Sequence, residues 1–120
     1  MILFEDKELH QNDIDLAIEE AKEKSKDKKG NVRAKIHGIH LDEYYGVFKA
    51  PTSILIDEIK KLDKKKGANS DMYLAEKCLI YPSVDDFKQV INEYPGLLSN
   101  VVSQLMVFSK FTAEIEVENL

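Results

Sequence analysis

The sequence predicts an α+β fold: a small antiparallel β-sheet with about five helices, of which the C-terminal ones form a helical bundle. Apolar, aromatic and β-branched residues across residues 32–50 follow strand-like patterns, which predicts a hairpin. Elsewhere apolar residues recur at the three- and four-residue spacing of helices. Prolines and isolated glycines separate these stretches, and no linker divides the chain. We therefore expect residues 1–120 to form a single domain.

The N-terminal part is predicted to form a short strand at 1–4 followed by a helix. Asn12 is the expected N-cap, because an acidic first turn follows it. Apolar residues from Ile14 to Ala21 recur at helical spacing, although the stripe is narrow. Gly30 is the expected residue just beyond the helix end.

The hairpin begins with alternating apolar residues at 32–36. The alternation changes phase after Gly38, which predicts a β-bulge there. Residues 41–43 form the expected turn, and 44–49 the returning strand. Gly46 lies inside that strand, where the lack of a side chain allows close approach of another group.

Two helices are expected between the hairpin and residue 80. Pro51 ends the strand, and Thr52 or Ser53 caps the first of these helices, which Gly67 closes. Ser70 is the expected cap of the second, which runs on to Leu79.

Two further helices follow proline residues. Ser83, with Asp86 three residues later, resembles a capping box. Pro95 and Gly96 break the chain before a last, strongly apolar helix. Residues 111–118 then alternate between apolar and mostly acidic side chains, which favours a strand over a frayed tail.

Composition limits the class of protein. The chain is 43% hydrophobic and 32% charged, with a net charge of −5, as expected of a globular protein. Its start lacks the basic and apolar regions of a signal peptide, and no apolar run approaches the ~20 residues of a membrane span. We therefore expect a cytoplasmic protein that does not enter a membrane.

Residues that could carry chemistry are few. His37 and His40 lie near each other in sequence, but a regular strand turns them to opposite faces. Cys78 is the only cysteine, and no base stands near it in sequence. Asp85 and Asp86 fit the first turn of a helix better than an acid–base pair. We expect no enzyme activity, no catalytic residue, no cofactor and no metal.

Residues 94–109 contain no charged side chain. Loss of charge together with apolar and Met enrichment is typical of the centre of protein interfaces. Two interpretations stay open: a central helix enclosed by the rest of the chain, or a helix with one face inward and another on a partner or on a second copy. The second interpretation predicts a partner-binding site at Leu97, Leu98, Val101, Val102, Leu105 and Met106.

Two lysine-rich segments raise the question whether the chain binds nucleic acid. Residues 22–35 carry seven bases and two acids, and residues 60–66 five bases and one acid. Such clusters bind phosphates, but cations also favour helix C-termini. The acidic total charge disfavours nucleic acid as a partner.

The order of short motifs resembles the tail assembly chaperones of long-tailed bacteriophages and prophages. The matching residues are Pro51 and Thr52 in "FKAPTSIL", Pro82 with two aspartates in "LIYPSVDDF", and Pro95 with Gly96 in "YPGLLSNVV". The resemblance covers roughly residues 34–108.

The resemblance implies a non-enzymatic protein of the host cytoplasm. Proteins of this family coat the tape measure protein during virion morphogenesis and help to recruit tail-tube subunits. The uncharged helix would then contact the tape measure protein or a second copy. The alternative function is a small dimerising adaptor or regulatory protein, with nucleic acid contacted through residues 22–35.

Overall fold

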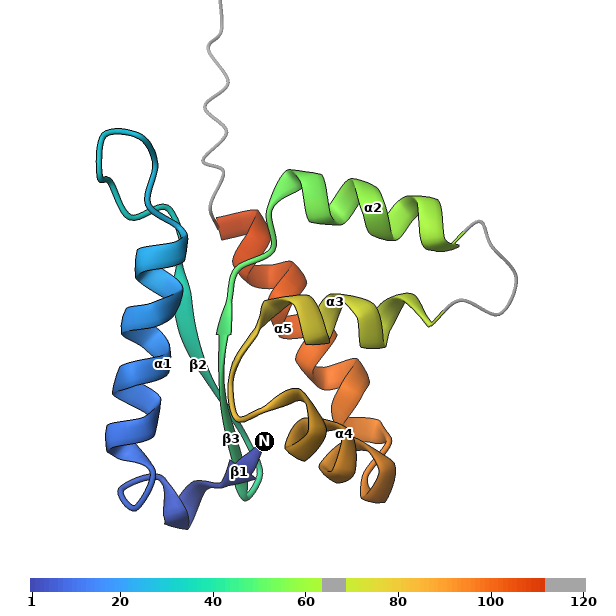
Figure 1. The fold of residues 1–120 in the computed structure, drawn as a ribbon. Helices are drawn as coiled ribbons and strands as arrows, with labels where there is room; N and C mark the ends of the chain where they lie inside the picture. The colour runs from blue at the N-terminus through green and yellow to red at the C-terminus, as the bar shows by residue number, and fades with distance from the viewer. Residues whose placement is uncertain (64–68, 112–120) are drawn as a thin grey trace, which may run out of the picture.

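A computed structural model describes residues 1–63 and 69–111 of the chain (Figure 1). This part contains a small antiparallel sheet and five α-helices, so the predicted α+β class is confirmed. The strands are β1 (Ile2–Leu3), β2 (Ile36–Leu41), β3 (Tyr44–Lys49) and β4 (Leu79–Tyr81). The helices are a 3-10 turn at Phe4–Asp6, α1 (Gln11–Lys24), α2 (Ser53–Asp63), α3 (Ser70–Cys78), α4 (Val84–Glu93) and α5 (Gly96–Phe111).

Strand β3 lies at the centre of the sheet. It pairs along its whole length with β2, from Ile36 opposite Lys49 to Leu41 opposite Tyr44. Its other edge is shared by β1 near the turn and by β4 further along. The hairpin turn has two residues, and Asp42 adopts a φ of 50°, a conformation that Asp tolerates better than most residues.

The main core lies between the sheet and the C-terminal helices. Figure 1 shows α1 on one side of the sheet and α2 to α5 on the other. Buried side chains from β2, β3, α3, α4 and α5 form one cluster, to which the predicted C-terminal bundle contributes most. Its members are Met1, Ile39, Phe48, Leu74, Ala75, Cys78, Phe87, Ile91, Leu97, Val101 and Leu105.

A second, smaller apolar layer lies under α1. Ile14 of α1 and Val47 of β3 are both buried, and neither belongs to the main cluster. Because neighbouring residues of a strand point to opposite faces, Val47 points away from Phe48, toward the side that α1 covers. The sheet is therefore packed on both faces, which explains why its strands do not show one clean apolar–polar alternation.

The bulge predicted at Gly38 is wrong, because the β2–β3 register runs without interruption. The change of phase arises because Ile36 and Ile39 serve opposite faces of a sheet that is covered on both sides. Gly38 has another role: a Cβ placed there would overlap the Tyr45 ring, with two ring carbons only 2.9 Å away. At Gly46, Met1 and Phe48 approach closely, as the sequence predicts.

Several boundaries differ from prediction by a few residues. Strand β2 begins at Ile36, and Val32 forms only an isolated bridge with Lys26. Helix α1 has His10 at its N-cap position in place of Asn12, without a side-chain cap. It ends at Lys24, and Gly30 occupies a later turn with a φ of 83°.

The caps of the later helices agree better with those predicted from the sequence. The Leu55 N–H donates to Thr52 Oγ1 (3.2 Å), and the Asp86 N–H donates to Ser83 Oγ (3.3 Å), both as predicted. Helix α3 is capped by Asn69 in place of Ser70. Helix α3 ends at Cys78, one residue before the predicted Leu79, and Leu79 begins β4. The predicted closure at Gly67 and the predicted strand at 111–118 lie outside the described residues, apart from Phe111, which ends α5.

Candidate interaction surface

Helix α5 turns one apolar row into the chain's own core. Leu97, Val101 and Leu105 follow one another at four-residue spacing, and their exposed fractions are 9%, 0% and 0%. They belong to the same cluster as Phe87 of α4. Half of the predicted partner-binding set therefore faces inward, and these three residues are not available to a partner of the folded chain.

The other half of the predicted set flanks this inner row. Leu98, Val102 and Met106 also recur every four residues, and each is half-buried against the edge of the core. Part of each side chain therefore remains open to solvent. Only this row of the predicted site is placed where another protein could reach it.

Between Ser99 and Val107 the outer face of α5 is exposed and carries no formal charge. Ser99, Asn100, Ser103 and Gln104 are all exposed, and Val107 is 38% exposed. The Ser99 hydroxyl already donates to the Gly96 carbonyl oxygen (3.1 Å), so its proton needs no new partner when water is removed. An ordinary surface helix carries Lys and Glu on such a face. The helix is thus enclosed on one side only, which is the geometry of the second interpretation above.

Aromatic contacts fix both ends of α5 against the hairpin. Tyr94, just before the helix, packs against Tyr44 with ring centroids 5.7 Å apart. Near the other end, Phe108 stacks on His37 with centroids 4.1 Å apart. The Pro95–Gly96 break sets the start of the helix between these contacts. The outer face is therefore presented by a helix that is held at two points.

The three histidines are engaged in separate contacts, His37 and His40 on β2 and His10 at the start of α1. His37 faces α5, whereas His40 stacks on Phe4 with centroids 3.9 Å apart. The His10 Nδ1 and the Tyr81 hydroxyl are hydrogen-bonded at 2.6 Å. Within residues 1–63 and 69–111 no group of three or more His, Cys, Asp or Glu is placed to hold a metal ion.

Cys78 is enclosed by the main core. Its exposed fraction is 0%, and burial raises the pKa of its thiol to about 12, against which the nearby Lys49 ammonium acts only in part. Because the thiolate is the reactive form, Cys78 has the environment of a structural cysteine rather than a nucleophile.

We expect Cys78 to resist thiol reagents while the chain is folded. With a pKa of about 12, roughly one thiol in 10⁴ is ionised at pH 8, against about a quarter for an ordinary cysteine. Labelling with a chromogenic disulfide at pH 8 should therefore be at least ~100-fold slower in buffer than in denaturant. Rapid labelling of the folded chain would contradict this placement.

Three of the seven bases in the lysine-rich segment at 22–35 form ion pairs with residues that the structure describes. Lys24 contacts Glu20 at 2.8 Å, Lys26 contacts Glu23 at 2.7 Å, and Arg33 contacts Asp27 at 2.8 Å. These exposed pairs reduce the charge that a phosphate backbone would meet. The second segment, 60–66, lies largely outside the described residues.

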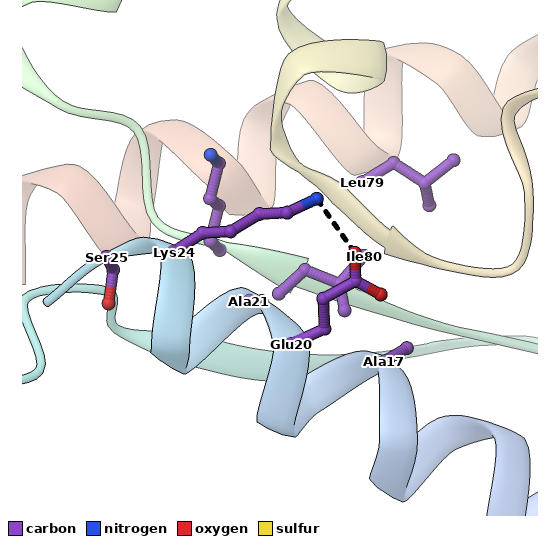
Figure 2. A pocket seen from close by; sticks show the side chains of 8 residues that line it. Ala17, Glu20, Ala21, Lys24, Ser25, Leu79 and Ile80 are labelled. Atoms are coloured by element: carbon purple, nitrogen blue, oxygen red, sulfur yellow. Dashed lines mark ion pairs between the residues drawn. The ribbon is translucent and has the colours of Figure 1, made fainter.

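A shallow hollow of about 290 Å³ lies between α1 and the strands β3 and β4 (Figure 2). Figure 2 shows the Glu20–Lys24 ion pair over it, with Ala21 and Ile80 lining it. The Glu20 carboxylate and the Lys24 ammonium pair with each other at 2.8 Å, and the Ser25 hydroxyl donates to the Lys22 carbonyl oxygen (2.8 Å). These polar groups of the hollow are therefore engaged in contacts with one another or with the backbone.

Comparison with known proteins assigns no family to this chain. No protein-family model matches it, and no match is found among curated proteins or solved structures. None of the helices in the described part of the chain combines the length and apolar character that a bilayer crossing requires. The case for any function therefore rests on the sequence of the chain and on the surface that it presents.

Some exposed apolar residues were not singled out by the sequence. Ile54 at the start of α2 is 71% exposed, Leu16 of α1 is 64% exposed, and Leu9 is 83% exposed. They are scattered over separate elements and make no single patch with α5. In the sequence such residues can be recognised only as apolar positions outside the buried stripe of a helix. Single exposed apolar residues of this kind are common on protein surfaces.

Proposed function

We propose that this chain is a non-enzymatic tail assembly chaperone of a long-tailed phage or prophage, acting in the host cytoplasm. In this role it binds helical segments of the tape measure protein through the open side of α5. The observation that carries the proposal is the exposed, uncharged face of that helix, from Ser99 to Val107, bordered by a half-buried apolar row. The order of proline-containing motifs between residues 34 and 108 supports the choice of family.

The chemistry of this face suits a helical, apolar partner. Serine and amide side chains lose little when water is removed, while Leu98, Val102 and Met106 offer apolar area beside them. An amphipathic helix laid alongside α5 would cover both kinds of side chain. Salt would weaken such a contact little, because no charge on this face takes part in it.

The size of α5 limits how strong the contact is. Sixteen residues make a helix about 24 Å long. One face of it covers well under the ~800 Å² per partner of a typical stable complex. A partner held mainly by this face therefore binds weakly and exchanges readily, which suits a chaperone that must leave the assembled tail.

Ser103→Lys is expected to weaken partner binding about 10- to 100-fold without unfolding the chain. Ser103 is exposed on the outer face, so the new ammonium costs little in the free protein but must lose water in the complex. Binding is measured by titrating helical fragments of the tape measure protein, which is encoded by a long gene next to that of this chain if the proposal holds.

Asn92→Lys is the matched control, since it adds the same charge at an exposed position of α4. Equal loss of affinity in both variants would show that net charge, not the α5 face, governs binding. Absence of a neighbouring gene for a long helical protein would contradict the choice of family.

The alternative function is a small dimerising adaptor, and the same face favours it. In a chain with a net charge of −5, a face without charge is where two copies repel each other least. Light scattering over a range of concentrations distinguishes the two functions. Dimers that Ser103→Lys dissociates would favour the adaptor, whereas a monomer that binds the tape measure fragments would favour the chaperone. Loss of binding to DNA or RNA with rising salt would instead indicate phosphate contacts.

A further inference from the structure

Three hollows on the described surface share one residue, Lys49 at the end of β3. The largest, about 560 Å³, is lined by the segment that leads into β2 and by the connection from β3 to α2. We call it the Lys49 hollow. Its lining residues are Ser25, Arg33, Ala34, Lys35, Lys49, Ala50, Pro51, Thr52 and Ser53.

The Lys49 hollow carries positive charge that the described part of the chain does not neutralise. Three of its lining residues are basic and none is acidic. Arg33 is held by Asp27, but neither Lys35 nor Lys49 has a carboxylate within 4 Å among residues 1–63 and 69–111. Lys49 ends β3, and Lys35 comes just before β2, where the Ala50 N–H donates to the Lys35 carbonyl oxygen (2.7 Å). Because both lysines line this hollow, its charge favours an acidic occupant.

The hollow also has apolar surface between these charges. Ala34, Ala50 and Pro51 line it, and Pro51 is buried. A free phosphate or another small anion would leave this surface uncovered. An occupant that matches the whole hollow must offer carboxylates and small apolar groups together, as an acidic peptide does.

The C-terminal end of α5 lies near the Lys49 hollow. Phe108 stacks on His37, which is only two residues from Lys35. Phe111, the end of α5, lies three residues further on, about 4.5 Å along the axis. Nine residues follow it, and in extended form they reach about 30 Å. Figure 1 shows this end of α5 at the same end of the molecule as the connection from β3 to α2.

The composition of residues 112–120 complements the hollow. The segment contains three glutamates and no base. In an extended peptide Glu114, Glu116 and Glu118 fall on one side, and Ala113, Ile115 and Val117 on the other. Such a peptide presents a row of carboxylates and a row of small apolar side chains at once.

We propose that the Lys49 hollow is a binding site for an extended acidic peptide, and that its occupant is residues 112–120 of the same chain. Glu114 and Glu116 pair with Lys35 and Lys49, and the apolar side chains cover Ala34 and Ala50. Each exposed ion pair is weak by itself. Attachment to α5 compensates, because a short tether gives the segment a millimolar effective concentration at the hollow. The inference does not depend on the function proposed above.

A spin label on the full chain tests the proposal. Asn119→Cys gives one reactive thiol for a nitroxide, because Cys78 is buried. The amides of residues 33–35 and 49–53 should then broaden strongly in NMR spectra of a dilute sample. Lys35→Glu with Lys49→Glu should reduce this broadening at least several-fold. Lys60→Glu, an exposed lysine of α2 outside the hollow, should not.

The outcomes separate the occupants. If only the amides of residues 36–41 broaden, residues 112–120 pair with the edge of β2 and the proposal is overturned. Broadening seen only between labelled and unlabelled molecules in a mixture would overturn it in favour of a second copy. Absence of broadening in well-dispersed spectra would leave the hollow without this occupant and end the proposal. The variant with Lys35→Glu and Lys49→Glu can then be combined with Glu114→Lys and Glu116→Lys. If the broadening returns in this fourfold variant, the pairing of charges is confirmed.

Discussion

The Val101→Asp variant is expected to be unfolded, or nearly so, at 25 °C and pH 7. Val101 has an exposed fraction of 0% and lies in the middle of the inner row of α5. Loss of its apolar contacts costs about 2 kcal/mol, and a buried carboxylate without a partner costs several kcal/mol more. The sum is comparable to the ~5–15 kcal/mol by which domains of this size are stable. Circular dichroism and urea unfolding measure the effect.

An aspartate introduced two residues later gives the contrast. Ser103→Asp adds a carboxylate to the exposed face of the same helix, so its effect on the free energy of unfolding should stay within about 0.5 kcal/mol. The Val101→Asp variant should also regain stability in acid. Burial raises the pKa of the introduced carboxyl in the folded state, so stability is greatest below the unfolded pKa of about 3.9 and falls as the pH rises above it. Equal effects of the two substitutions would show that α5 does not have an inner and an outer side.

Sequence alone could not choose the inner side of α5. Residues 97, 101 and 105 and residues 98, 102 and 106 form two neighbouring rows of similar apolar character. Helical spacing therefore predicts an apolar stripe but not its centre. Packing against Phe87 and Ile91 of α4 and Leu74 of α3 decides that the first row is enclosed. The predicted site consequently mixed core residues with surface residues.

Local signals were most informative where one side chain determines the backbone. Thr52 and Ser83 cap their helices as predicted, and the Pro95–Gly96 break sets the start of α5. Strand β4 was missed because three residues are too few to show a period, and because its pairing with β3 joins parts of the chain that are far apart in sequence. The Lys49 hollow could not be predicted for the same reason, since the topology alone brings Lys35, Lys49 and Ser53 together.

Phe48→Ala and Phe87→Ala are each expected to lower the free energy of unfolding by about 3–5 kcal/mol. Both rings have an exposed fraction of 0%, and they join the central strand to α4. The cavity left by either ring is enclosed by the sheet and by the helices on it, so the surroundings have little freedom to close it. Urea unfolding of the two single variants and the double variant measures these effects.

The double variant should lose less than the sum of the single variants. The two rings meet edge to face, with centroids 6.0 Å apart and an interplanar angle of 76°. Such pairs contribute about 0.5–1.5 kcal/mol beyond the area they bury, and this shared part is removed by either substitution. Phe4→Ala is the matched control, because that ring is 41% exposed and should cost only about 1 kcal/mol. If Phe48→Ala cost no more than Phe4→Ala, the aromatic contact between sheet and helices would not be the centre of the fold, and the support that it gives to α5 would have to come from elsewhere.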